Sequence, residues 1–208
     1  RPAANPTAFG KAQVTVDTVI LARDNQSLLN EFQTDFNVHQ EIGTDHGKEL
    51  AKFFDEAFLI QAIKSAGLSA PAGLNGAFGA GKVETLAAAN DEFDPDKLYT
   101  EIAQIITRMQ EEDIDTDESA VFVRPTQFEV LLNHDKLIDR DFSTDNGDFA
   151  NGKIKTIKGV PIVQTARIPT TAISGHYLSN AGNGNAYDLS AAEAKAVAIV
   201  LHPQSLLA

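Results

Sequence analysis

Hydrophobic residues recur at helical spacing over the longest predicted element, between residues 44 and 66. Thr44 or Asp45 can cap this helix, and Gly67 can end it. One face of this helix carries an apolar stripe of Leu50, Phe53, Phe54, Ala57 and Phe58. Four more apolar residues extend the stripe around nearly the whole circumference of the helix: Leu59, Ile60, Ala62 and Ile63. A helix of roughly 22 residues is about 33 Å long. Because so apolar a helix must bury most of its surface, we expect it to be covered on several sides.

Further helices are predicted on either side of this one. A short helical stretch is expected at residues 27–36. Asp94 caps a longer helix, in which Pro95 occupies the first position, where its missing N–H costs nothing. The apolar positions of that helix are Leu98, Ile102, Ile105, Ile106 and Met109. Pro125 and Thr126 begin another helix, whose apolar residues are Phe128, Leu131 and Leu132.

Strands are predicted where apolar residues alternate or run together between turn signals. They cover residues 13–21, 120–123, 154–157, 160–168 and 195–201. Lys158 and Gly159 join the third strand to the fourth. Pro161 indicates that the fourth strand lies at a sheet edge or begins there, because proline cannot donate to a sheet.

The half of the chain after residue 90 therefore alternates helices and strands, which is typical of a compact α/β or α+β unit. Five glycines among alanine, proline and asparagine indicate a flexible loop at residues 67–82, between two structural halves. Turn residues predict two further loops, at 145–147 and 179–186. The first half has too little partner structure to bury its long helix, so that helix should pack on elements outside these residues or on other subunits.

Composition narrows the classes of function. Hydrophobic residues make up 43% of the chain, which is enough for a folded core. A net charge of −12 argues against a general phosphate-binding surface, because nonspecific binding of nucleic acid needs clustered lysine and arginine. The absence of cysteine excludes disulfides, thiol catalysis and thiolate metal sites. No run approaches the ~18 apolar residues of a membrane-spanning helix.

Both ends of the sequence predict that it is the middle of a longer polypeptide. The chain opens with Arg1, and it closes with the strand at 195–201 and a short apolar tail. A free-standing domain rarely ends in this way with nothing to cover the tail. Strands that close the fold and arms that bind neighbours are therefore expected beyond these residues.

The segment Gly76–Lys82, with the sequence GAFGAGK, fits the first seven positions of a phosphate-binding loop. Val83 follows where a serine or threonine should hold magnesium. A buried strand should precede such a loop and a helix should begin at its lysine, and neither is predicted here. A glycine- and alanine-rich connector is therefore favoured over a nucleotide site.

Asp113, Asp115 and Asp117 have the spacing of the first ligands of a calcium-binding loop. The sixth position is Glu118 instead of glycine and the twelfth is Arg124 instead of glutamate, so the pattern fails and a solvated acidic turn is expected. A second acidic group consists of Asp139, Asp141, Asp145 and Asp148. It could bind a divalent ion weakly, but a charged surface loop is favoured.

His46 and Glu49 lie one turn apart near the start of the long helix and could hold a metal, although no third ligand is apparent. The other histidines show no ligand spacing: His39, His134, His176 and His202. There is no Gly-x-Ser-x-Gly elbow. We assign no catalytic, cofactor-binding or metal-binding residue, which favours a structural or assembly role.

Several short strings resemble the major capsid proteins of short-tailed, podovirus-type, double-stranded DNA bacteriophages. In the first half these strings are VTVD at 14–17, ILA at 20–22 and GKELA at 47–51. In the second half they are VFVRPTQF at 121–128, KGVPIV at 158–163 and AIVLHP at 198–203. The order of the predicted elements is also similar over most of residues 11–206.

The resemblance implies an α+β fold, the tailed-phage major capsid fold, with both ends missing. The end of an extended loop or strand would occupy residues 1–22, and a peripheral domain with a long spine helix would occupy 23–66. A connector loop at 67–94 would lead to an axial α/β domain at 95–208, which starts the return to the peripheral domain. Residues 139–152 and 170–190 would then face the symmetry axis or the surface, and residues 67–82 would act as a hinge or contact.

The resemblance also implies a non-enzymatic, cofactor-free shell subunit. It would form hexamers and pentamers of an icosahedral capsid around double-stranded DNA, without sequence-specific contact and without a membrane. Its partners would be a scaffolding protein, a portal and decoration proteins, with assembly in the bacterial host cytoplasm and a final place in the virion. An acidic inner wall would avoid trapping the DNA.

Two alternatives remain open at this point. One is an encapsulin-type bacterial compartment shell, which resembles the same fold and packages an enzyme in place of DNA. The other is a nucleotide-binding enzyme that uses Gly76–Lys82.

Overall fold

The computed structural model describes residues 18–25, 38–68, 81–138, 147–148, 153–154 and 156–205. Its helices are α2 (Val38–Ala66), α3 (Pro95–Glu111), α4 (Pro125–Leu132) and α5 (Asp135–Ile138). Its strands are β1 (Ala120–Val123), β2 (Gly147–Asp148), β3 (Lys153–Ile154), β4 (Thr156–Ile157), β5 (Val160–Gln164) and β6 (Ala198–Leu201).

A mixed four-stranded sheet lies at the centre, in the order β4-β5-β1-β6. Strand β1 is parallel to β5, with Val121 opposite Ile162, and antiparallel to β6, with Phe122 opposite Ile199. Strands β4 and β5 form a hairpin. Lys158 and Gly159 both adopt positive φ, 48° and 86°, in its two-residue turn, as the right-handed twist of a hairpin favours.

Helices α3 and α4 cover one face of this sheet. Because side chains alternate along a strand, Val121 and Val123 both point to that face and have no exposed surface. They pack with α3 residues Leu98, Ile102 and Ile106, in the cluster that also contains Leu131 of α4. The helical spacing in α3 and the period of two in β1 therefore build one core.

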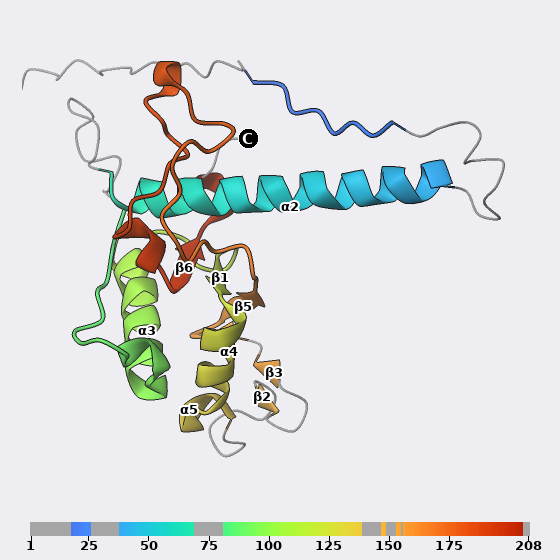
Figure 1. Cartoon of the computed structure of the whole chain (residues 1–208). Helices are drawn as coiled ribbons and strands as arrows, with labels where there is room; N and C mark the ends of the chain where they lie inside the picture. The colour runs from blue at the N-terminus through green and yellow to red at the C-terminus, as the bar shows by residue number, and fades with distance from the viewer. Residues whose placement is uncertain are drawn as a thin grey trace, which may run out of the picture.

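Helix α2 covers the opposite face of the sheet through its C-terminal half. Leu59 and Ala62 pack with Ile199 of β6 and with Ile168, which follows β5, and the partly buried Phe122 joins them. The neighbouring position Ile60 points elsewhere and is completely buried against Leu189 and Ala194. Part of the segment from residue 173 to 195 therefore loops over the side of α2 away from the sheet (Figure 1).

Helix α2 begins six residues earlier than the sequence predicted. Residues 38–43 are helical, and Thr44 is an internal residue whose hydroxyl donates to the carbonyl of Gln40 at 2.8 Å instead of capping the helix. The end was predicted correctly, because Ala66 is the last helical residue. The helix therefore has 29 residues instead of about 22. The predicted helix at 27–36 lies outside the described residues.

The strands also differ in extent. Residues 18–21 form no strand, and residues 13–17 are not described. Strand β5 ends at Gln164 instead of Ile168, because the chain leaves the sheet to pack on α2. Pro161 is the second residue of β5, which is an inner strand and not an edge strand. The pairing of β5 with β1 starts at Ile162, after the proline.

The projecting half of α2 and the β2–β3 hairpin lie at different extremes of the molecule (Figure 1). The N-terminal half of α2 extends beyond the sheet, and residues 18–25 run alongside it. The β2–β3 hairpin and α5 lie at the end of the sheet-containing body that is farthest from α2. The described protein is therefore a packed body with a long helical arm.

Candidate assembly surfaces

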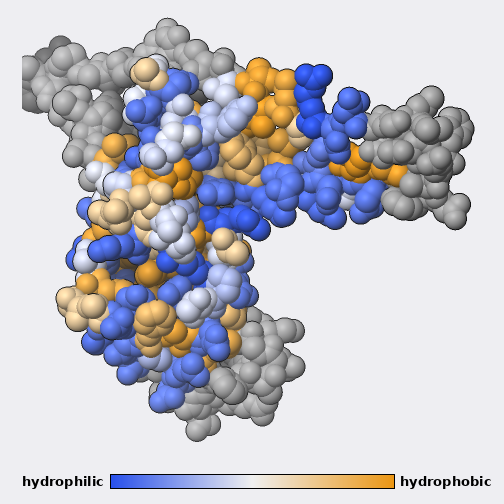
Figure 2. All heavy atoms as spheres, in the orientation of Figure 1, coloured by the Kyte–Doolittle hydropathy of each residue, from blue (hydrophilic) through white to orange (hydrophobic). Residues whose placement is uncertain are grey.

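The projecting half of α2 is largely uncovered. From residue 39 to Glu56, every residue keeps at least partial exposure, whereas Ala57, Leu59, Ile60 and Ala62 are buried. Phe54 and Phe58 are 46% and 40% exposed. Figure 2 shows hydrophobic residues gathered between α2 and segment 18–25 and hydrophilic residues along the opposite side of the helix.

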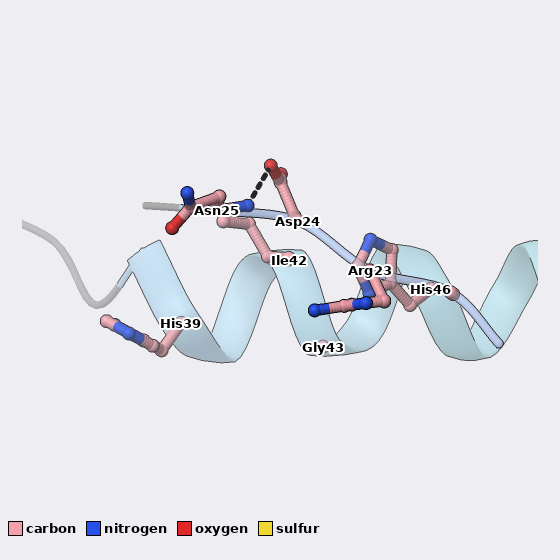
Figure 3. Close-up of a pocket in the computed structure, with 8 residues that line it drawn as sticks. Arg23, Asp24, Asn25, His39, Ile42, Gly43 and His46 are labelled. Carbon is pink, nitrogen blue, oxygen red and sulfur yellow. Dashed lines mark hydrogen bonds between the residues drawn. The ribbon is translucent and has the colours of Figure 1, made fainter. Parts of the chain in front are cut away.

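A groove of about 520 Å³ separates residues 22–25 from the first turns of α2. It is lined by Ala22, Arg23, Asp24, Asn25, His39, Ile42, Gly43 and His46. Figure 3 shows Arg23 and His46 over the same part of the helix, while Asp24 points away and accepts a hydrogen bond from the Asn25 amide at 2.7 Å. The groove therefore offers a guanidinium and imidazole donors beside the apolar Ile42.

A stack of three rings fastens the 173–195 segment to α2. The ring of His176 is sandwiched between Phe53 of α2 and Tyr187, with centroid distances of 5.4 and 5.5 Å and interplanar angles of 18° and 17°. Gln61 also donates to the carbonyl of Ala186 at 2.9 Å. Phe53 and Gln61 lie about two turns apart on α2, so the two contacts hold the loop along the helix.

Two carboxylates fix the shape of this segment. The carboxylate of Asp188 accepts from the amides of Gly175 and His176, both at 3.0 Å. A hydrogen bond from the Ser179 hydroxyl, which has the largest effect, and those from the two amides stabilise the charged carboxylate and lower the pKa of Asp188. Glu193 accepts from Ser190, which lowers the pKa of Glu193 as well, and it forms a 3.5 Å ion pair with Lys64 of α2.

Arg124 connects the end of β1 to the same segment. Its guanidinium donates to the carbonyls of Pro169 and Ala194, at 2.5 and 3.2 Å. Desolvation by burial lowers the pKa of Arg124. Arg124, which the sequence offered no reason to expect as a structural contact, therefore joins the sheet to the segment that covers α2.

The described part of the glycine-rich motif has a structural role. A Cβ on Gly81 would lie 2.4 Å from the Cα of Ala66, so only glycine fits where this segment crosses the end of α2. Lys82 forms a 2.6 Å ion pair with Glu112, and Glu84 pairs with Arg108. No helix begins at Lys82. Residues 76–80 lie outside the described part of the chain.

The remaining candidate ligands are dispersed. Glu49 forms an ion pair with Lys52 at 2.6 Å, and this contact lowers the pKa of Glu49. His46, the other residue of the predicted pair, lines the groove instead. His134 stacks on Tyr99 at 4.2 Å, and its Nε2 lies 3.3 Å from a carboxylate oxygen of Asp96. Over the described ranges, no three histidine or carboxylate side chains are grouped as metal ligands would be.

The acidic turn after α3 is exposed, as the sequence predicted. Asp113 adopts a positive φ of 57°, and the amide of Ile114 donates to the carbonyl of Met109 at 3.0 Å, which closes the helix end. The carboxylate of Asp115 accepts from the amide of Asp117 at 2.9 Å. Of the second acidic group, the structure describes only Asp148, in β2.

Comparison with known proteins identifies the family. A family model described as Gp10A-like major capsid protein matches residues 29–205, which is most of the chain. The chain belongs to the Gp10A-like major capsid protein family. This capsid protein is thus a component of a phage shell and of the virion, and its family is structural. No curated protein matches its sequence.

Solved capsid structures share the fold. The asymmetric unit of the bacteriophage PhiM1 mature capsid matches at a TM-score of 0.70 and 28% identity, over 93% of this chain and 64% of that one. The capsid structure of cyanophage P-SCSP1u matches at 0.69 and 20% identity, over 84% of this chain and 53% of that one. The capsid protein described here thus spans about two thirds or less of their length. The predicted α+β capsid fold with its long spine helix is confirmed.

The described parts of the two segments that were expected to face the symmetry axis or the surface, 139–152 and 170–190, lie in different parts of the molecule (Figure 1). The segment 173–189 packs on α2 through the stack of His176 on Phe53 and the burial of Ile60 against Leu189. The other segment, 139–152, includes Gly147 and Asp148 of β2, which lie at the end of the body farthest from α2 (Figure 1). Its other residues are outside the described ranges.

Among the described helices, none is both long enough and apolar enough to cross a bilayer.

Proposed function

We propose that this capsid protein is a non-enzymatic shell subunit that forms hexamers and pentamers of an icosahedral capsid around double-stranded DNA. The observation that carries the proposal is the uncovered half of α2, in a chain of this family. An apolar helix face with Phe54 and Phe58 exposed is costly for an isolated protein and favours burial against other subunits. Identical subunits can cover such faces by repeating one contact around a ring.

The arrangement of the chain supports a division into spine and axial parts. We propose that the peripheral part consists of residues 23–66 together with 168–197, since the second segment packs on α2. The sheet with α3 and α4 would form the axial part, and residues 67–94 the connector. The β2–β3 end, with 139–152, would face the symmetry axis, and the loop at 170–190 would belong to the spine.

The proposed partners follow from shell assembly. A scaffolding protein would guide assembly in the bacterial host cytoplasm, and a portal and decoration proteins would join the shell. The net charge of −12 supports an inner capsid wall that repels packaged DNA and makes no sequence-specific contact with it. No cofactor is required.

Electron microscopy of the purified full-length protein tests the proposal. Closed shells with six-fold and five-fold capsomers are expected when it is expressed with its scaffold. Double-stranded DNA in shells purified from infected cells would support the phage capsid, whereas a packaged enzyme would point to the encapsulin-type alternative. Monomers or small oligomers under all scaffold and salt conditions would contradict the proposal.

A further inference from the structure

The groove at the start of α2 contains two side-chain donors, Arg23 and His46, with no hydrogen-bond or ion-pair partner in the described part of the chain. Ile42, which lies to one side of them beside Asn25, also lines the groove and is only partly buried (Figure 3). An occupant that fits this groove must carry carboxylates around an apolar side chain.

The acidic turn after α3 presents that chemistry. Ile114 is 39% exposed and is held outward by the closed end of the helix. Six acidic residues surround it in the sequence, all of them exposed: Glu111, Glu112, Asp113, Asp115, Asp117 and Glu118. Glu112 pairs with Lys82, and the carboxylate of Asp115 accepts a hydrogen bond within its own loop. This leaves four carboxylates of the turn without an ion pair or hydrogen bond in the described part of the chain: Glu111, Asp113, Asp117 and Glu118.

The two features lie at opposite ends of α2. The groove faces its first turns, whereas the acidic turn is tied to its last turn through the ion pair of Glu112 with Lys82 and the close approach of Gly81 to Ala66. The 29 residues of α2 separate them by roughly 40 Å. One copy cannot join its own turn to its own groove, but two copies placed head to tail can.

We propose that the acidic turn at residues 111–118 of one copy docks into the groove formed by residues 22–25 and the start of α2 in a neighbouring copy. Asp117 and Glu118 pair with Arg23, and Ile114 packs beside Ile42. The contact is heterologous, so it closes into a ring when the rotation between copies allows. It rests on the proposed shell function and specifies one of the contacts by which capsomers form.

Site-specific cross-linking of full-length protein tests the contact, because the chain has no cysteine of its own. One preparation carries Ala22→Cys and another carries Asp117→Cys, and the two are co-assembled and treated with a short bis-maleimide. A cross-linked dimer that contains one copy of each is expected. Lys48→Cys mixed with Asp117→Cys is the control, because Lys48 is exposed on α2 away from the groove.

Charge reversal provides a second readout. Arg23→Glu is expected to raise the concentration needed for assembly by about tenfold or more, because like charges then meet in the contact. Combining Arg23→Glu with Asp117→Lys and Glu118→Lys in the same chain should restore assembly. Lys48→Glu, a reversal outside the groove, should leave it unchanged.

The outcomes separate this contact from the shell function. Wild-type shells that form without the heterologous cross-link and tolerate Arg23→Glu would overturn the contact and leave the shell function intact. If the wild-type protein forms no shells, the shell function fails and the contact fails with it. Cross-linking together with rescue by the triple reversal supports both.

Discussion

At the scale of single residues, the glycine-rich motif shows how one pattern fits two physical causes. A phosphate loop needs glycine so that backbone amides can approach a ligand, and a crossing of two backbone segments needs glycine for the same lack of a Cβ. The sequence could not distinguish these causes. The structure distinguishes them: Gly81 lies against the backbone of Ala66, and Lys82 forms an ion pair with Glu112.

Gly81→Ala is expected to lower the free energy of unfolding by about 1–3 kcal/mol, because the new Cβ would overlap the backbone of α2. Urea denaturation measures the change. Gly47→Ala is the matched control: nothing lies within 4 Å of a Cβ there, and replacing a helical glycine should stabilise by about 0.5–1 kcal/mol. Equal effects of the two substitutions would contradict the close approach at Gly81.

Asp188 makes the attachment of the 173–189 loop sensitive to acid. Its folded pKa lies below the ordinary value of 3.8, so the carboxylate stabilises the fold above that pH. That stability is lost as pH falls through the folded pKa. We therefore expect Asp188→Asn to be less stable than wild type in urea at pH 6, with the difference shrinking at pH 3. A difference that does not change between these two pH values would contradict this role of the carboxylate.

At the scale of elements, helix ends were predictable where a side chain satisfies the free backbone amides. The carboxylate of Asp94 accepts from the amides of Asp96 and Lys97, at 3.1 and 3.3 Å, and Pro95 follows it, as the sequence indicated. The start of α2 was missed because Thr44 and Asp45 look like caps. Val38 and Ile42 already continue the helical spacing toward His46, which is the signal that could have placed the start correctly.

Asp94→Ala is expected to cost about 0.5–2 kcal/mol of stability, because two amides of the first turn of α3 lose their acceptor. Asp94→Asn keeps an acceptor oxygen at the same position and should change stability by no more than a few tenths of a kcal/mol. Thermal and urea denaturation of both variants measure the difference. A loss with asparagine as large as with alanine would mean that charge, and not the hydrogen bonds, is what matters there.

At the scale of the whole molecule, α2 is the element around which the protein is arranged. Residues only one position apart on it face different layers: Leu59 faces the sheet, and Ile60 faces the segment from 173 to 195. The sequence correctly predicted a helix that needs cover on several sides. It did not predict that residues more than a hundred positions away supply that cover.

Ile60→Ala is expected to lower the free energy of unfolding by about 2–5 kcal/mol, because Ile60 is completely buried and the cavity would lie between α2 and a segment distant in sequence. Phe58→Ala is the matched control, because Phe58 lies two residues before Ile60 on the exposed side of α2 and keeps 40% of its surface accessible. Its effect on the stability of the unassembled protein should be clearly smaller. Denaturation of unassembled protein provides the comparison, and a larger loss for Phe58 would contradict the proposed packing.

Elements whose signals are local could be predicted from the amino-acid pattern. Period-two burial in β1, helical spacing and capping in α3, and the two-residue turn before β5 each depend on neighbours within a few residues, so the pattern carries them. Tertiary structure alone decided which face of α2 meets the sheet, that Arg124 reaches Pro169 and Ala194, and that Arg23 and His46 share one groove. Those contacts join residues far apart in the chain, and their energy depends on three-dimensional packing that no local periodicity encodes.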